Sequence, residues 1–525
     1  MQTSNLISLS AELIFAIGGP LPFADLKQLR LSCRSLSDTI SVLVLHSLHI
    51  FKEGSRLSED VALLGSLADN SKTSPICLNA HTITFGYLDP GYSRADAKSS
   101  GISQSEYKNA TNSIVTGILA CKNLRKVRSN IISEDPKWLQ SAILTLMQTI
   151  PSLRECVLNG GIFTRGFNIS NLITLESLSI TEISDDPKEL VDSVSDLIAA
   201  SPNLTSLEMV KCKRWSTNYS LHSLLAKISQ NPTQGSGGCA IKNLRLEKFL
   251  VRFDSVALLH LKSLVSLSIM QQENIHATLL FADSSKIDTM CGSSPALWTA
   301  LRESGIHLQE IEHDCISDAL IEYLESFSGL RKLELKVQYF SQTNLAGALL
   351  AKFFSRAFPK HMATLETFSI DSRLENQWRC GPTILQALIE CPKLKNIGIA
   401  VDFNQLTNPF ALDKLDESPE GDIIKQLLDQ TITHLPLLET ISLHECRSNA
   451  PFEKCGIARS RRIEYLNNRI MSVIQKYRAP EGTLYLPRLS LSTPSTSLFG
   501  DRLDKKTVKT GSQRDPKYGG RLMYS

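Results

Sequence analysis

A short hydrophobic frame recurs through most of this 525-residue chain, and it constrains the possible folds more than any other feature. The frame reads leucine, two variable residues, a hydrophobic residue, one variable residue and a second hydrophobic residue. Such alternation predicts a strand with one buried face. The leucines that open the frames are Leu124, Leu153, Leu175, Leu204, Leu264, Leu308, Leu330, Leu365, Leu394 and Leu438.

The stretches between the frames have hydrophobic residues at helical spacing. Examples are Leu190, Val194, Leu197 and Ile198 before one frame, and Ile384, Leu385, Leu388 and Ile389 before another. A single strand and helix cannot close a core, whereas units stacked side by side bury a continuous one. We therefore expect an α/β fold of repeated helix, turn and strand. The irregular spacing of the frames places insertions in the connecting loops.

The frame resembles the leucine-rich repeat, whose pattern is L-x-x-L-x-L-x-x-N/C. The ninth position of that pattern is Cys212 when counted from Leu204, and Cys446 when counted from Leu438. Other units depart from the pattern at this position. The resemblance implies an irregular leucine-rich-repeat solenoid with a parallel sheet on its concave face.

A second pattern lies near the start of the chain, over residues 9–40. Glycines and prolines at 18–22 interrupt any helix there, so we expect short helices at about 11–17, 26–31 and 34–45, with Asp25 capping the second. The segment resembles an F-box, although Ser10 replaces a usual proline and Leu36 a common tryptophan. The matching residues are Leu9, Glu12, Leu13, Ile14, Ile17, Leu21, Asp25, Leu26, Leu29, Leu31, Cys33, Arg34 and Leu36. A plain helical cap on the domain that follows is the alternative.

The resemblance implies that this segment binds a Skp-type adaptor and, through it, a cullin. Three short helices cannot bury so much apolar surface among themselves, which also favours a partner. The residues expected to contact the adaptor are Leu9, Leu13, Ile14, Ile17, Leu21, Leu26 and Leu29.

These patterns predict four segments. We expect an F-box helical domain at 1–50, a linker or cap at 51–75, a leucine-rich-repeat solenoid at 76–480, and a terminal strand with a disordered basic tail at 481–525. Hydrophobic residues on one helical face at 456–478 predict a closing helix, and residues 483–491 predict the terminal strand.

Composition narrows the possible partners and compartments. A net charge of +3 gives no argument for nucleic acid or a membrane as the main partner. The N-terminus lacks the basic region of a secretory signal, so we expect the 12 cysteines to be reduced and the protein to be cytoplasmic, nuclear or both.

No stretch has the pattern of a known active site, such as a Walker A loop, a G-x-S-x-G elbow or an H-E-x-x-H helix. His313, Asp314 and Cys315 bring a base, an acid and a thiol together, but neighbours on a strand point to opposite faces. Cys380 and Cys391 are eleven residues apart and have no matching histidine pair to complete a Cys2His2 zinc site. We therefore expect no enzyme activity, metal or cofactor.

The variable residues of the frames are expected to face solvent on the concave surface. Many are charged and few are aromatic, which suits a protein target better than a small metabolite. The candidates for target binding are Arg125, Lys126, Arg128, Arg154, Glu176, Glu208, Arg331 and Lys332. We interpret the chain as the substrate-recognition subunit of a Skp-cullin-F-box ubiquitin ligase with an unknown target; a non-catalytic repeat scaffold outside ubiquitylation is the alternative.

Overall fold

The computed structural model describes residues 9–19, 21–51, 57–86, 104–130, 135–159, 168–183, 188–211, 218–220, 224–225, 241–247, 250–252, 258, 260–270, 294–337, 343–372, 378–401, 423–445, 477–478, 487–493, 496–500 and 510–511. The chain forms two compact units. Unit 1 contains Met1–Phe249 and Leu259–Ser263, and unit 2 contains Leu250–Leu258 and Leu264–Ser525. Among the described residues, no helix is both long and apolar enough to cross a membrane.

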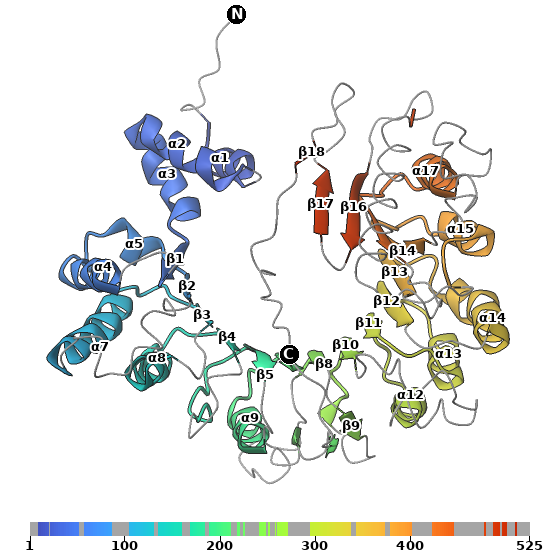
Figure 1. Cartoon of the computed structure of the whole chain (residues 1–525), viewed down its shortest axis with the longest axis horizontal. Helices are drawn as coiled ribbons and strands as arrows, with labels where there is room; N and C mark the ends of the chain where they lie inside the picture. Colours follow the sequence, from blue (N-terminus) through green and yellow to red (C-terminus); the bar gives the residue numbers. More distant parts are fainter. Residues whose placement is uncertain are drawn as a thin grey trace, which may run out of the picture. The chain divides into compact units, whose positions relative to one another are not determined.

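Unit 1 pairs a parallel sheet with a layer of helices. Neighbouring strands in the sheet are β1 (Ser47–Ile50), β2 (Thr82–Phe85), β3 (Lys126–Ser129), β4 (Glu155–Asn159), β5 (Ser177–Ile183), β6 (Ser206–Lys211) and β8 (Asn243–Glu247). The helices are α1 (Ala11–Gly18), α2 (Phe23–Ser32), α3 (Arg34–Val44), α4 (Leu57–Asp69), α5 (Pro75–Asn79), α7 (Gln104–Leu119), α8 (Lys137–Thr149) and α9 (Lys188–Ala200), and a short strand, β7, spans Asn218–Ser220. Figure 1 shows α4, α7, α8 and α9 on one side of the strands.

Unit 2 has the same construction. Its parallel strands are β10 (Ser266–Met270), β11 (Glu310–His313), β12 (Lys332–Val337), β13 (Thr367–Ser372), β14 (Asn396–Val401), β15 (Thr440–Glu445) and β16 (Arg488–Thr493). Two antiparallel strands, β17 (Thr496–Gly500) and β18 (Thr510–Gly511), follow β16, and β9 spans Leu250–Arg252. The helices are α12 (Ser294–Glu303), α13 (Asp318–Glu325), α14 (Thr343–Lys352), which continues through the turns η8 (Phe353–Ala357) and η9 (Phe358–Lys360), α15 (Pro382–Ile389) and α17 (Ile423–His434).

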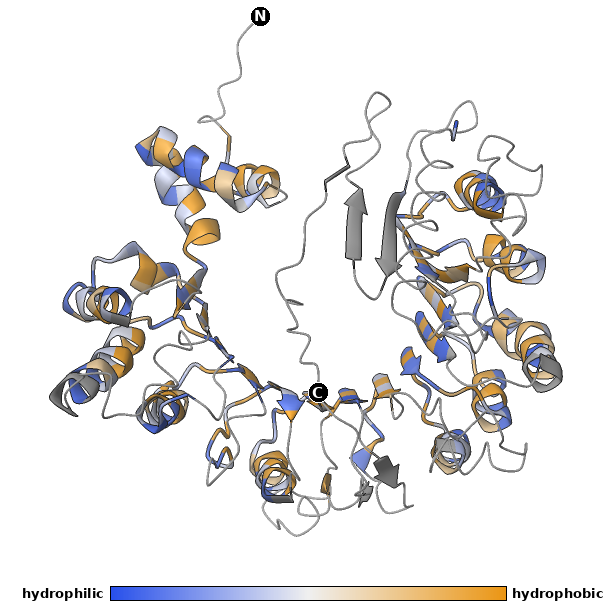
Figure 2. Cartoon of the chain, viewed as in Figure 1, coloured by the Kyte–Doolittle hydropathy of each residue, from blue (hydrophilic) through white to orange (hydrophobic). Residues whose placement is uncertain are grey.

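The hydrophobic frame explains the strands. Every frame leucine named above is buried, as are the frame's second and third hydrophobic positions on β12, Leu333 and Leu335. The second hydrophobic positions of neighbouring strands are in register: Val127 pairs with Cys156, and Phe368 pairs with Ile397. Figure 2 shows hydrophobic and hydrophilic residues alternating along the strands of unit 2. The predicted α/β repeat with a parallel sheet is therefore confirmed.

Three strands lie outside the frames used for prediction. The β1 and β8 strands fit the frame from Leu45 and Ile241, whereas in β2 the small residue Ala80 occupies the leucine position and is fully buried. The repeats therefore begin at Ser47, inside the segment that the sequence analysis assigned to the F-box, and two strands precede the first one that was predicted.

The C-terminal expectations are met in part. The terminal strand expected at 483–491 is β16 at Arg488–Thr493, and β17 and β18 lie in the segment expected to be disordered. The predicted closing helix at 456–478 falls almost wholly outside the described residues. Cys212 and Cys446, which occupy the ninth position of the repeat pattern, also lie outside them.

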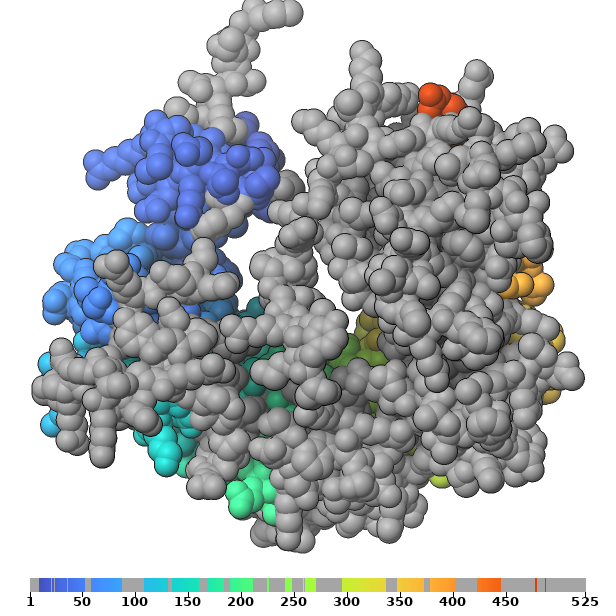
Figure 3. Space-filling model, in the orientation of Figure 1, coloured from blue at the N-terminus to red at the C-terminus, as the bar shows by residue number. Residues whose placement is uncertain are grey.

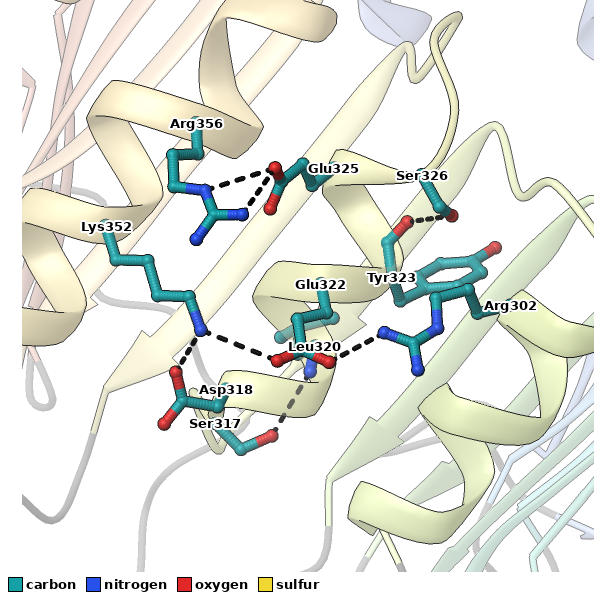
Figure 4. Close-up of polar contacts among 10 residues, drawn as sticks. All are labelled: Arg302, Ser317, Asp318, Leu320, Glu322, Tyr323, Glu325, Ser326, Lys352 and Arg356. Atoms are coloured by element: carbon teal, nitrogen blue, oxygen red, sulfur yellow. Dashed lines mark hydrogen bonds and ion pairs between the residues drawn. The ribbon is translucent and has the colours of Figure 1, made fainter.

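The helix layer of unit 2 is joined by polar contacts on its outer side (Figure 4). The carboxylate of Glu322 accepts from Arg302 Nη1 at 2.6 Å and lies 3.6 Å from Lys352 Nζ, which also contacts Asp318. These bridges connect α12, α13 and α14, but their exposure to solvent limits each to about 1 kcal/mol or less.

Candidate adaptor-binding and target-binding surfaces

Helices α1 to α3 form a small helical unit with its own core. Ile14, Leu26, Leu36, Ile40 and Val44 are buried against one another. Leu9, Leu21, Leu29, Cys33, Leu43 and Leu45 pack partly buried around them. The side chains cluster because α3 presents its apolar stripe to α1 and α2.

The helix boundaries are close to the predicted ones, with one correction. The second helix begins at Phe23, not residue 26, so Asp25 lies in its first turn and makes no capping hydrogen bond. Its negative charge still suits the helix N-terminus. The third helix is capped by Cys33, whose Sγ accepts from the Leu36 N–H at 3.5 Å.

The predicted adaptor-binding residues divide into two groups. Ile14 and Leu26 are at most 7% exposed and belong to the core, while Leu9, Leu21 and Leu29 lie at its edge. Only Leu13 and Ile17 are well exposed, at 52% and 43%. These two residues are four apart on α1, so they lie on one helix face.

Sequence reasoning left two further exposed residues out of the contact set. Leu31 on α2 is 78% exposed, and Val42 on α3 is 37% exposed. Figure 3 shows the atoms of α1 to α3 at the surface of the chain. Leu31 was recognised as part of the F-box pattern, but hydrophobicity alone could not show that it points outward.

The predicted target-binding residues lie on or just before the strands, but in both units. Arg125, Lys126, Arg128, Arg154, Glu176 and Glu208 belong to unit 1, whereas Arg331 and Lys332 belong to unit 2. The candidates therefore form two separate sets, one on the strand face of unit 1 and one on the strand face of unit 2.

Most of these charges are paired with the neighbouring repeat. In unit 1, Lys126 Nζ lies 2.6 Å from Glu155 Oε2, and Arg154 Nε lies 3.3 Å from Glu176 Oε1. Glu208 lies 3.3 Å from Arg245 and also accepts from the Ser179 hydroxyl at 2.7 Å. Ion pairing therefore neutralises much of the strand face from β3 to β8.

The strand face of unit 2 is paired in the same way. Glu366 accepts from Lys395 and Arg331 of the neighbouring repeats, which together lower the pKa of its carboxyl group. Within β12, Lys332 lies 3.2 Å from Glu334. The nearly buried Glu312 accepts from the Ser268 hydroxyl at 2.8 Å and from Lys336 at 2.7 Å.

The start of the sheet in unit 1 is different. His46, His49, His81, Arg125 and Arg128 lie on or just before β1 to β3, and we call them the basic strand face. The side chains of Arg125 and Arg128 are exposed and make no ion pair or hydrogen bond within the described part of the chain. The histidines escaped sequence reasoning because β1 and β2 were not recognised as repeats, although the frame from Leu45 would have revealed the first.

The suspected base, acid and thiol near residue 314 are structural. His313 Nδ1 donates to the Ile269 carbonyl at 2.7 Å and is 3.9 Å from Asp314 Oδ1, and burial lowers the pKa of His313 to about 4. Cys315 is disulfide-bonded, so the expectation of a reduced thiol is wrong there; a general argument from compartment cannot foresee which thiols the fold brings together.

The other described cysteines form no disulfide, and those at 380 and 391 are buried. Burial raises the pKa of both Cys380 and Cys391 to about 12, which keeps each thiol protonated and unreactive. Within the described residues, no three or more histidine, cysteine, aspartate or glutamate side chains are grouped as a metal site would require.

Comparisons with known proteins add little. No family model matches the chain, and no curated protein matches it in sequence. Among solved structures, a crystal structure of the Rad7 and Elc1 complex in yeast is similar at 13% identity and a TM-score of 0.34, over 83% of this chain and 94% of that chain. Similarity at this level does not establish a shared fold or function.

Proposed function

We propose that the chain is the substrate-recognition subunit of a Skp-cullin-F-box ubiquitin ligase. Helices α1 to α3 bind a Skp-type adaptor, which connects the chain to a cullin, and the strand face binds a target protein. The chain itself performs no chemistry and needs no cofactor. It acts by holding the target near the ubiquitin-loaded enzyme, which raises the local concentration of the reacting groups.

One observation supports the adaptor site most. The helical unit closes a core around Ile40 and still leaves Leu13 and Ile17 exposed on one face of α1. A helix that served only as a cap would gain nothing from two exposed aliphatic side chains, each of which would contribute roughly 1.5–3 kcal/mol if a partner buried it. The resemblance of residues 9–40 to an F-box supplies the identity of that partner.

The target site is supported by the strand faces. They present charged side chains on regular secondary structure, and protein ligands are commonly bound on the open sheet of a repeat protein. Arg125, Lys126, Arg128, Arg154, Glu176 and Glu208 in unit 1 and Arg331 and Lys332 in unit 2 remain the candidate contacts.

The test is affinity purification of the full chain from cells, followed by detection of the Skp-type adaptor and the cullin. Leu13→Asp and Ile17→Asp place a charge on the exposed face of α1 without entering the core, and each should reduce the recovered adaptor at least about tenfold. Leu26→Asp is unsuitable because Leu26 is buried and the change would unfold the helices.

Leu78→Asp is the matched control, since Leu78 on α5 is 53% exposed and Leu13 is 52% exposed. It should leave adaptor recovery unchanged. Equal recovery from Leu13→Asp and wild type would refute the proposed adaptor site. Recovery of the adaptor without the cullin would instead favour a scaffold that acts outside ubiquitylation.

A further inference from the structure

The basic strand face contains two exposed arginine side chains, Arg125 and Arg128, that no described carboxylate neutralises. Residues 46–51, 81–86 and 124–130, which contain β1 to β3, include no aspartate or glutamate. From β4 onward, the repeats contribute carboxylates: Glu155 pairs with Lys126, and Glu176 pairs with Arg154. Unpaired positive charge beside three histidines, with no carboxylate in these segments, favours a ligand of opposite charge.

The backbone places the five residues in two rows. In the first row, the N–H of His81 donates to the His46 carbonyl and that of Arg125 donates to the His81 carbonyl, both at 2.9 Å. The imidazole rings of His46 and His81 stack with their centroids 5.0 Å apart. In the second row, His49 and Arg128 are in register with Thr84 between them.

The spacing of these rows identifies the shape of the ligand. Adjacent strands lie about 4.8 Å apart, and three residues along a strand span about 10 Å. The five side chains therefore cover an area about 10 Å on each side, which is wider than one phosphate group. Side chains on one face of an extended peptide recur about every 6.8 Å, so a run of acidic residues can place several carboxylates over this area.

We propose that the basic strand face binds an acidic segment of a partner protein, in which consecutive aspartate and glutamate side chains contact Arg125, Arg128 and the three histidines. This inference rests on the proposed function, because it specifies an acidic segment as the part of the target protein that the strand face of unit 1 binds. The strands β1 to β3 supply a rigid frame, and Arg125 and Arg128 can each form a two-pronged contact with a carboxylate. Among the described residues, neither arginine side chain has an ion pair that it must first break.

His81 gives the interaction a predicted pH dependence. The ionisable side chains over this face are His46 and His49 from β1, His81 before β2, Arg125, Lys126 and Arg128 from β3, and Arg154 and Glu155 from β4. Of these, Glu155 is held by Lys126. Burial, His46 and Arg125 lower the pKa of His81, so this ring is mostly neutral at neutral pH and gains a proton only in mildly acidic solution.

The experiment measures binding of the full chain to a labelled synthetic peptide with a central run of aspartate and glutamate. The matched control peptide replaces these residues with asparagine and glutamine. The acidic peptide should bind, and the control peptide should bind at least about tenfold more weakly. Binding should strengthen as the pH is lowered from about 7 to about 5.5, because His81 gains charge while the peptide carboxylates, with pKa values near 4, keep most of theirs.

Arg125→Ala with Arg128→Ala should weaken peptide binding at least about tenfold. Arg356→Ala, which removes an exposed arginine already paired with Glu325 in the helix layer of unit 2, is the matched control and should change it less than about twofold. Because both arginines of the basic strand face are exposed, the double variant should unfold at the same temperature as the wild type, and this measurement checks that it is folded. Adaptor recovery should be normal in them, which separates a failure here from a failure of the proposed function.

Three results would overturn the inference. The first is equal binding of the acidic and the neutral peptide. The second is tighter binding of a single-phosphate peptide or of a single-stranded RNA than of the acidic peptide; the phosphopeptide would also lose charge on acidification, since its second pKa is near 6. The third is peptide affinity that is insensitive to the double arginine variant.

Discussion

Two glycines in neighbouring helices provide a sharp test of the packing in unit 1. Gly117 on α7 faces α4 so closely that an added Cβ would lie 2.3 Å from the Leu64 carbonyl oxygen. Gly65 on α4 has open space at the same position, with no atom within 4 Å. Replacing each glycine with alanine is therefore the same chemical change in two opposite settings.

The magnitudes follow from these distances. The Gly117→Ala methyl group needs about 1 Å more room, and a backbone atom blocks it, so the overpacking cost lies near the upper end of the usual range, about 3 kcal/mol. Alanine recovers about 1 kcal/mol of helix propensity, which leaves a net destabilisation of about 2 kcal/mol. Gly65→Ala incurs no overpacking and should stabilise its helix by about 1 kcal/mol.

The assay is native-state hydrogen exchange of the full chain, read on the amides of α4 and α7, because this measurement reports local stability without requiring the whole chain to unfold in one step. Protection in these helices should fall in Gly117→Ala and rise in Gly65→Ala. Changes of the same sign and size in both variants would refute the close packing of α4 and α7.

Three further predictions concern the core, the buried histidines and the surface. Leu26→Ala should destabilise the helical unit by about 2–5 kcal/mol in hydrogen exchange, whereas Leu13→Ala should change it by less than about 0.5 kcal/mol, since only Leu26 is buried; equal effects would contradict the division into core and surface residues. His361 is buried with a pKa lowered to about 4 by burial, and its Nδ1 accepts from the Leu330 N–H, so the unfolded chain takes up a proton below about pH 6.5 that the folded chain refuses. The stabilisation that neutral His361 provides is complete above about pH 6.5 and is lost as the pH falls toward about 4, with a loss of about 1.4 kcal/mol at about pH 5.5. In urea melts, the acid destabilisation of His361→Gln should be smaller than that of the wild type by this amount. An unchanged pH profile would show that His361 is not the titrating group. Arg356→Ala, which removes an exposed contact with Glu325, should cost no more than about 1 kcal/mol in urea melts, and a larger loss would mean that the bridge between the helices is structural.

The repeat architecture was predictable because its signal is periodic. A strand frame such as the one from Leu330 places three apolar residues on one face at a fixed spacing, and the structure buries all three. The β2 strand escaped prediction because Ala80 stands where the frame has leucine, and only the neighbouring repeats show that a small residue fits there.

The division of the F-box-like segment into core and surface was not predictable. Leu13 and Ile14 are adjacent, similar in hydrophobicity and both part of the pattern, yet Ile14 is buried and Leu13 is exposed. What separates them is the core of the helical unit, because Ile14 belongs to the buried cluster that includes Ile40 of α3 and Leu13 does not. The rotation of α1 about its own axis is set by the helices packed against it, so the hydrophobic pattern of the sequence cannot specify which of the two residues is buried.

Charge neutralisation was equally hidden from the sequence. Lys126 and Glu155 lie 29 residues apart and meet because adjacent strands align their first positions. Arg128 looks the same as Lys126 in sequence but is in register with Val157, so it has no carboxylate opposite it. The difference between a paired and an unpaired charge thus depends on strand register.

The most direct test of the central claim is a binding titration between the purified full chain and a purified Skp-type adaptor. We expect saturable binding by the wild type and by Leu78→Asp, and affinity at least about tenfold lower for Leu13→Asp and Ile17→Asp, with unchanged thermal unfolding in all of them. Absence of binding by the wild type, or equal affinity of the wild type and Leu13→Asp, would contradict the assignment of α1 to α3 as an adaptor-binding F-box.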